Sequence, residues 1–193
     1  MALPCWDKMM QLSKFKNREM YHALLPAQPA VQWQRLGFTN IARPKAQFIM
    51  WVACNNKLPC KERLHRFGLL STSKCTFCNA IETLNHLMFE CPVTYVIWEF
   101  VLNWLQQGHS PLRWEEEIKW VMEKCKGKGS KATILKCAFT ETIYETWIFR
   151  NRCCFGRSKE SDNVNIGPSI TDYIVYRSWP NHKLKKYVAK LMM

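Results

Sequence analysis

Three cysteines and one histidine lie close together in the middle of the sequence, with the spacing of a metal-binding site. Cys75, Cys78, His86 and Cys91 form the pattern C-x2-C-x7-H-x4-C within 17 residues. Two cysteines separated by two residues can turn tightly enough for both thiolates to bind one ion, and the histidine and the last cysteine then complete a tetrahedron. These soft and borderline ligands favour Zn²⁺, and a set of four leaves no open position for a substrate. We therefore predict a structural zinc site.

The segment between the two ligand pairs must bring the histidine to the cysteines. Residues 82–89 have the pattern of a short helix whose apolar side packs inward while His86 faces the metal. The inward-facing residues are Leu84, Leu87 and Met88. Pro92 then ends this helix or begins the next one. In a closed site the binding energy of the metal, roughly 10–16 kcal/mol for structural zinc, becomes folding energy.

Apolar residues at helical spacing predict helices along most of the chain and very little strand, so we expect a mostly α fold. The predicted helices are 8–25, 45–54, 60–67, 96–105, 114–122, 131–151 and 170–179, with 31–38 as a short segment docked against the core. Gly68 follows the end of the third helix, and three glutamates (115–117) begin the fifth, where they suit the helix dipole. Residues 162–168 look like a weak polar break, and residues 183–190 like a basic tail.

The same periodicity indicates which helix faces should be buried. The helix 45–54 presents Phe48, Trp51 and Val52 on one face. The helix 96–105 presents an apolar stripe formed by Val96, Ile97, Phe100, Val101, Trp104 and Leu105. The long helix 131–151 repeats Leu135, Phe139, Ile143 and Trp147 every four residues. Tryptophans on apolar helical faces are expected to pack in the core rather than to stack on bases. These are Trp51, Trp98, Trp104 and Trp147.

Composition describes a globular chain with a strong positive charge. The 193 residues are 48% hydrophobic, which allows a real core in one domain or in two small ones. The net charge of +13 favours an anionic partner, with nucleic acid as the first candidate and an acidic membrane surface as the second. No secretory signal and no membrane-spanning run is visible. We therefore expect an intracellular protein, in the cytoplasm or the nucleus, whose ten cysteines are reduced thiols.

An ordered series of short motifs resembles a known family. The series consists of PKAQFIMW at 44–51, NKLPCKERL at 56–64, the C-x2-C pair, Glu82-Thr83, His86-Leu87, FECP at 89–92 and Trp98. It resembles the zinc-binding domain found after the reverse transcriptase in plant LINE-type (non-LTR) retrotransposons. The resemblance spans about residues 33–105 and leaves 1–32 as an N-terminal helical flank and 106–193 as a helical C-terminal region with a basic tail.

The resemblance implies a role beside an RNA template or a DNA target during retrotransposition. The metal ligands of the family fall on Cys75, Cys78, His86 and Cys91, all intact, whereas Cys60 stands where such sequences often have threonine. Polymerase and ribonuclease H sites hold two metal ions on clustered carboxylates, but the three aspartates of this chain lie far apart in the sequence. We therefore expect no catalysis, and we interpret the chain as a detached C-terminal piece of a retroelement protein, either a relic or a reused one.

Three groups of basic residues are candidates for contact with nucleic acid. The first is Lys57, Lys61, Arg63 and Arg66, where the two arginines share a helix face and would neutralise phosphates regardless of base sequence. A solvated helix face is the alternative. The second is Lys124, Lys126, Lys128 and Lys131, for which a solvated loop is favoured. The third is Lys183, Lys185, Lys186 and Lys190, whose pattern is also compatible with a nuclear-import signal.

Three alternatives stay open at this point. In a purely structural or protein-interaction module, zinc would hold the helices and the basic charge would contact nothing specific. In an enzyme, Cys91 would act as a nucleophile beside His86, but a metal-bound thiolate is a poor nucleophile and no third group orients the histidine. Cys60 and His65 could also act as additional metal ligands.

Overall fold

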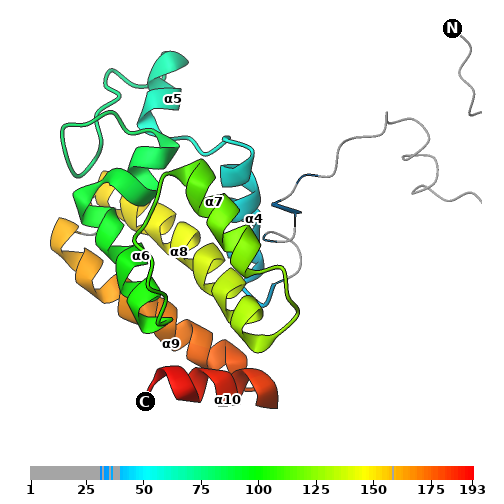
Figure 1. The fold of residues 1–193 in the computed structure, drawn as a ribbon. Helices are drawn as coiled ribbons and strands as arrows, with labels where there is room; N and C mark the ends of the chain where they lie inside the picture. Colours follow the sequence, from blue (N-terminus) through cyan, green and yellow to red (C-terminus); the bar gives the residue numbers. More distant parts are fainter. Residues whose placement is uncertain (1–30, 32, 35, 37–39, 158) are drawn as a thin grey trace, which may run out of the picture. The chain divides into compact units, whose positions relative to one another are not determined.

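Helices make up nearly all of the regular structure in the computed structural model, which describes residues 31, 33–34, 36, 40–157 and 159–193 (Figure 1). The elements in chain order are α4 (Pro44–Cys54), α5 (Lys61–Arg66), the π-helical turn η1 (His86–Glu90), α6 (Pro92–Trp104), α7 (Trp114–Lys124), α8 (Ser130–Cys154), the 3-10 turn η2 (Glu160–Asn165), α9 (Ile166–Ser178) and α10 (His182–Leu191). The mostly α prediction is therefore confirmed. The predicted helix at 8–25 lies outside the described residues.

Helix α8 forms the centre of the unit that spans residues 32–193. It contacts α4, α6, α7, α9 and α10, and Figure 1 shows it running behind α6 and α7. Its predicted apolar repeat is buried at all four positions, which are Leu135, Phe139, Ile143 and Trp147. Helices from both sides of residue 105 share this core. The predicted docking of residues 31–38 agrees with Leu36, which is fully buried.

Local sequence signals explain where several helices begin and end. Pro44 and Pro92 occupy the first helical positions of α4 and α6, where the missing N–H is not needed and the fixed φ suits the helix. Pro92 thus begins the helix after the metal-binding segment. Gly68 follows α5 with φ of +70°, a left-handed conformation that a side chain would disfavour.

The predicted buried face of α4 is wrong at its two aromatic positions, although the third residue of that face, Val52, is partly buried against the core. Ala46, Met50 and Ala53 are the buried residues, whereas Phe48 is 60% exposed and Trp51 is 36% exposed. The two small alanines let α4 approach α8 closely, and the bulky aromatic residues consequently lie on the outer side, with their ring centroids 6.0 Å apart. Of the four tryptophans expected in the core, Trp98 and Trp147 are buried and Trp104 is partly buried, but Trp51 is not.

The predicted stripe of α6 is confirmed at Ile97, Val101 and Leu105, which are buried, and is wrong at two other positions. Val96 and Phe100 are 40% and 42% exposed, whereas Trp98 is fully buried and donates its Nε1–H to Glu117 of α7 at 2.8 Å. Phe100 lies against α9, because a Cβ added to the buried Gly167 would lie 2.5 Å from the Phe100 ring. A glycine at this position therefore permits the close approach of the two helices.

Glu117 has a different role from the one expected of a glutamate at a helix start. Its side chain is fully buried and accepts hydrogen bonds from Trp98 Nε1–H and from the Leu112 backbone N–H, each at 2.8 Å. His109 Nε2 lies 2.9 Å from its second oxygen, and the His109 ring stacks on Trp120. Glu117 thus fixes the loop before α7 against α6, rather than serving only the helix dipole.

The C-terminal segment is more ordered than the sequence pattern suggested. The predicted polar break at 162–168 contains η2 and the first turn of α9, and the predicted basic tail at 183–190 is helix α10. Leu184 and Val188 of α10 are buried against α8 and α9. The basic residues between them had concealed this apolar stripe. Among the described residues, no helix is both long and apolar enough to cross a membrane.

Asn181 caps the N-terminus of α10, and its replacement by alanine should loosen that helix. Its side-chain oxygen accepts the backbone N–H groups of Lys183 at 3.0 Å and Leu184 at 3.2 Å. We expect Asn181→Ala to cost about 1 kcal/mol of unfolding free energy, because both donors lose their partner. Denaturant titration measures the loss. Asn181→Ser retains a capping oxygen and should restore most of the stability, and an equal loss in both variants would contradict the capping role.

Candidate metal centre

The structure brings together all four predicted metal ligands. The Sγ atoms of Cys75, Cys78 and Cys91 and a ring nitrogen of His86 lie within 4.8 Å of one another. The Cys75 and Cys91 sulfurs are 3.9 Å apart, and Cys78 Sγ lies 3.2 Å from His86 Nε2. Bond lengths of about 2.3 Å to sulfur and about 2.0 Å to nitrogen give tetrahedral edges of about 3.8 Å and about 3.6 Å. The donor set and its spacing therefore fit a tetrahedral Zn²⁺ ion.

A short hairpin positions the first two cysteines. Lys74 and Ile81 form an isolated antiparallel bridge, and the Cys75 N–H donates to the Ala80 carbonyl at 2.8 Å. Within the turn, the Phe77 N–H points at Cys75 Sγ at 3.4 Å. This closed turn holds the two sulfurs on one side, as the C-x2-C spacing predicted.

A π-helical turn aligns the other two ligands. Thr83 precedes it and accepts the His86 N–H on its Oγ1 at 3.0 Å. The Cys91 N–H then bonds to the His86 carbonyl at 2.7 Å, an i→i+5 bond. In an α-helix, residues five apart point roughly 140° away from each other, because each residue turns by about 100°. The wider π-helical turn places Cys91 above His86. Two residues separated by four others can therefore contribute to the same metal site.

The hydrogen-bond donors around Cys91 favour its thiolate form, the form that binds metal. The pKa of Cys91 is lowered, chiefly because the Cys75 thiol donates a hydrogen bond to its sulfur, against the opposing effect of burial. The backbone N–H groups of Val93 and Thr94 lower it further. The pKa of Cys75 is correspondingly raised by the same hydrogen bond and by burial. In the metal-free pair, Cys91 is therefore the thiol that ionises first.

A buried carboxylate joins the metal-binding hairpin to the rest of the fold. Glu82 is fully buried, and its Oε1 accepts the Lys61 N–H at 2.9 Å and two guanidinium N–H groups of Arg150 on α8, the Nε–H at 3.1 Å. Its Oε2 accepts the Thr76 hydroxyl at 3.2 Å. Glu82 therefore links the hairpin, α5 and α8. In the sequence Glu82 is recognisable only as part of a motif, because its partner Arg150 lies 68 positions away.

The first basic group lies on α5 and the turn before it, next to the buried Glu82 side chain and its partners, which we call the Glu82 anchor. Lys57 and Arg66 are exposed, and Lys61 and Arg63 are half-buried. Two of the side chains already have local partners, because Arg63 donates to the Asn56 carbonyl at 2.8 Å and Arg66 pairs with Glu62 at 3.0 Å. The metal-binding segment and the basic group are thus adjacent through the Lys61 N–H bond to Glu82.

Two residues weighed as additional ligands do not join the cluster. Within the described part of the chain, the group around Cys75 contains only the four residues named above. Cys60 is buried, and burial together with the Glu82 carboxylate raises its pKa to about 12. His65 is exposed on α5, and its Nδ1 lies 2.9 Å from the Leu70 carbonyl oxygen.

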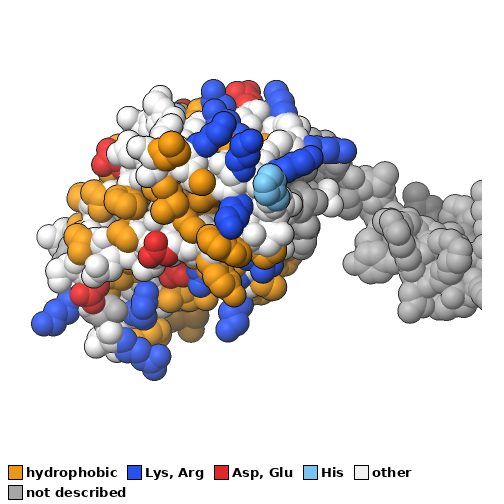
Figure 2. All heavy atoms as spheres, turned by 90° about the horizontal axis from the view of Figure 1, so that it is seen from below, with side chains coloured by type: hydrophobic (Ala, Val, Ile, Leu, Met, Phe, Trp, Pro, Cys, Tyr) orange, Lys and Arg blue, Asp and Glu red, His pale blue; other side chains and the backbone are white. Residues whose placement is uncertain are grey.

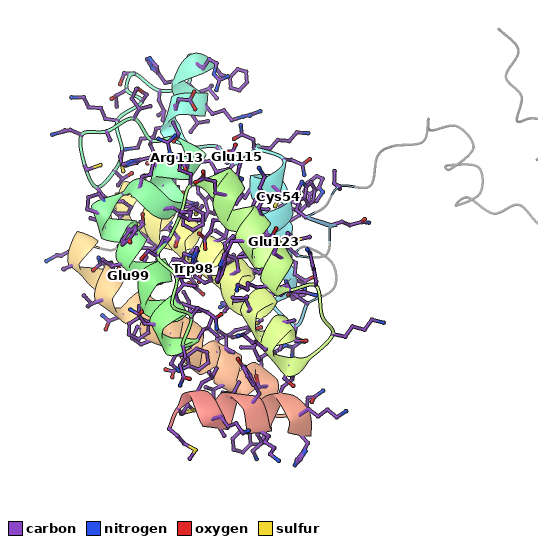
Figure 3. The ribbon with its side chains drawn as sticks, viewed as in Figure 1. Cys54, Trp98, Glu99, Arg113, Glu115 and Glu123 are labelled. Carbon is purple, nitrogen blue, oxygen red and sulfur yellow. The ribbon has the colours of Figure 1, made fainter. Side chains whose placement is uncertain are left out.

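The residues just before His86 also border a cleft of about 510 Å³. Its walls include Cys54 from α4 and Glu115 from α7, both labelled in Figure 3, together with Thr83 and Leu84. Burial raises the pKa of the Cys54 thiol to about 12, so this thiol is protonated at neutral pH and a poor nucleophile.

Comparison with known proteins found a match to one protein family. No curated protein and no solved structure gave a match. The family model described as zinc-binding in reverse transcriptase matches residues 15–98, a span that contains all four ligands and ends within α6. The match and the four-ligand geometry together support a reverse transcriptase zinc-binding domain in this part of the chain.

Proposed function

We propose that Cys75, Cys78, His86 and Cys91 bind a structural Zn²⁺ ion, and that the zinc-stapled domain assists the binding of RNA or DNA without catalysis of its own. The observation that carries the metal proposal is the convergence of four ligand atoms within 4.8 Å in a segment that matches a zinc-binding family. The motif series between Pro44 and Trp98 further supports an origin in a plant LINE-type element.

A structural role follows from how the ligands are held. Three of the four ligands are buried, and all come from the protein, which leaves no position for a substrate on a tetrahedral ion. The ion would join the hairpin at Cys75 to the start of α6 at Cys91, a region otherwise held by the Glu82 anchor. Elemental analysis of the purified protein should find one Zn²⁺ per chain, and a metal-free folded chain would overturn this assignment.

The nucleic-acid proposal rests on charge and position. The chain carries 28 basic and 15 acidic residues, and the Lys57–Arg66 group adjoins the metal-binding hairpin. Such a group would contact phosphates and would show little base preference. We propose that this contact takes place in either the cytoplasm or the nucleus. The competing proposal is a structural or protein-interaction module in which this charge has no nucleic-acid partner. This competing proposal is favoured by the local partners of two arginines, because Arg63 already bonds to the Asn56 carbonyl and Arg66 to Glu62.

Removal of two charges from α5 separates these proposals. We expect Lys61→Ala with Arg66→Ala to leave the fold intact, to weaken binding of a labelled single-stranded RNA or duplex DNA, and to reduce the slope of log K against log salt by about two. Fluorescence anisotropy across salt concentrations measures both effects. Lys45→Ala with Lys119→Ala removes the same charge from exposed positions on α4 and α7 outside the three basic groups and is the control.

The possible outcomes separate two questions, namely whether the chain binds nucleic acid and whether the basic residues of α5 make the contact. Wild-type binding by the α5 variant, or an equal loss of binding in the α5 variant and the control variant, would show that α5 is not the specific contact surface. No binding of either nucleic acid by the wild-type chain, even at low salt, would remove the nucleic-acid proposal and leave the structural module.

A further inference from the structure

Two aromatic side chains at the C-terminal end of α9 are unusually exposed. Tyr176 is 74% exposed and Trp179 is 63% exposed, and together with Arg177 and Pro180 they line a pocket. Large aromatic residues normally contribute most of their area to a core or to an interface. Arg177 is held in place by the hydrogen bond from its Nε–H to the Ile41 carbonyl at 2.9 Å, so this end of α9 is a fixed surface.

The neighbouring helix α10 surrounds these rings with positive charge. Lys183, Lys185, Lys186 and Lys190 are all exposed, and no acidic residue occurs between Tyr173 and Met193. Lys185 Nζ lies 3.6 Å from the centroid of the Trp179 ring, which still keeps most of its surface exposed. The face seen from the α10 end of the molecule shows apolar side chains bordered by lysines and arginines (Figure 2).

A second segment extends this charge. The Ser130 hydroxyl at the start of α8 lies 3.3 Å from the Lys183 carbonyl oxygen, which it can donate to. The exposed Lys128 and Lys131, on either side of Ser130, therefore adjoin the first turn of α10. Charge from two segments thus meets at the first turn of α10.

The packing of α10 favours a nucleic acid over a lipid surface as the occupant. A helix that lies on a membrane inserts its apolar face among the lipids. In α10 that face is already used, because Leu184 and Val188 are 7% and 2% exposed and pack on α8 and α9. What remains outside is a row of lysines beside two flat rings, a combination that binds single strands by phosphate neutralisation and base stacking.

We propose that the surface formed by Tyr176, Trp179 and the lysines of α10 binds single-stranded nucleic acid, with unpaired bases stacked on the rings and phosphates on the lysines. This inference rests on the proposed function, since it assumes a nucleic-acid partner. It adds a second contact surface that lies outside the matched residues 15–98 and is selective for unpaired bases. Duplexes and abasic strands offer the same phosphates but no accessible base faces.

The test compares the zinc-loaded full chain on three labelled probes of equal length, which are a single-stranded oligonucleotide, an abasic strand and a duplex. We expect the wild-type chain to bind the single strand about tenfold more tightly than the abasic strand. Trp179→Ala should abolish this preference while changing abasic affinity less than twofold, and Trp179→Phe should retain part of it. Phe155→Ala, which removes a ring that is 73% exposed at the end of α8, is the matched control.

Each outcome decides a different point. Equal affinity for the single and abasic strands overturns this inference while the nucleic-acid role of the α5 group survives. No binding of any probe removes both. A preference that survives both Trp179→Ala and Tyr176→Ala, in variants with wild-type circular dichroism, places the stacking elsewhere and overturns the inference. Stronger binding to anionic vesicles than to the single strand, lost in Trp179→Ala, would assign the surface to a membrane instead.

Discussion

Replacing His86 with alanine is expected to unfold the region around residues 60–105. The variant loses one of four ligands and with it most of the metal affinity, and structural zinc contributes roughly 10–16 kcal/mol of apparent binding energy to folding. A typical domain has only about 5–15 kcal/mol of net stability, so the remaining contacts cannot compensate. Circular dichroism should show a loss of helix and a much lower thermal midpoint, and elemental analysis a loss of zinc. Cys78→Ser should behave in the same way.

Two controls separate the metal from the side chain. His86 is itself buried, so its truncation also removes packing. Treating the wild-type chain with a strong chelator removes only the ion and should reproduce the unfolding. Cys54→Ala removes a half-buried thiol outside the ligand group and should cost about 1 kcal/mol or less while keeping the zinc. Wild-type helix content and midpoint in the chelated chain would show that the metal does not hold the fold.

Removing the guanidinium from Arg150 should produce the second largest effect. Arg150→Met keeps the apolar stem but leaves the fully buried Glu82 carboxylate without its cation. Breaking a buried pair by removing one partner typically costs about 3–5 kcal/mol, because the other charge stays desolvated. We expect a loss of this size in denaturant titration of the zinc-loaded chain. The double variant Glu82→Gln with Arg150→Met should be more stable than Arg150→Met alone, since no unpaired charge then remains.

An exposed ion pair on α5 provides the comparison. Arg66 and Glu62 form an i,i+4 pair whose side chains are 66% and 41% exposed. Solvent screens such a pair, so Arg66→Met should change the unfolding free energy by no more than about 0.5 kcal/mol. If Arg150→Met were no more destabilising than Arg66→Met, the Glu82 anchor would not be holding the hairpin to α8.

Short-range sequence information was sufficient for several parts of this fold. The C-x2-C-x7-H-x4-C spacing grouped four residues that the structure places within 4.8 Å of one another. The repeat of apolar residues every four positions identified the buried face of α8. Gly68 marked a helix end correctly, and Pro92 begins α6, which is one of the two roles that the sequence allowed for it. Each of these signals acts within a few residues along the chain, where backbone geometry alone relates sequence to structure.

The errors have a common cause in packing between distant segments. Phe48 and Trp51 have the right spacing for a core face, yet close packing of Ala46 and Ala53 against α8 turns them outward. The lysine-rich pattern of α10 concealed the stripe formed by Leu184 and Val188. Periodicity shows that residues share a face, but only the neighbouring element decides which face is covered.

The sequence by itself determined the metal-ligand pattern, the helical class and the positive charge, because these depend on residue type and local spacing. Only the tertiary structure decided that Glu82 pairs with Arg150 and that Tyr176 and Trp179 lie exposed beside the lysines of α10. The physical reason is that burial and charge pairing are properties of surfaces in contact. Those surfaces come from residues far apart in the chain, and a local sequence pattern does not indicate which distant residues will be in contact.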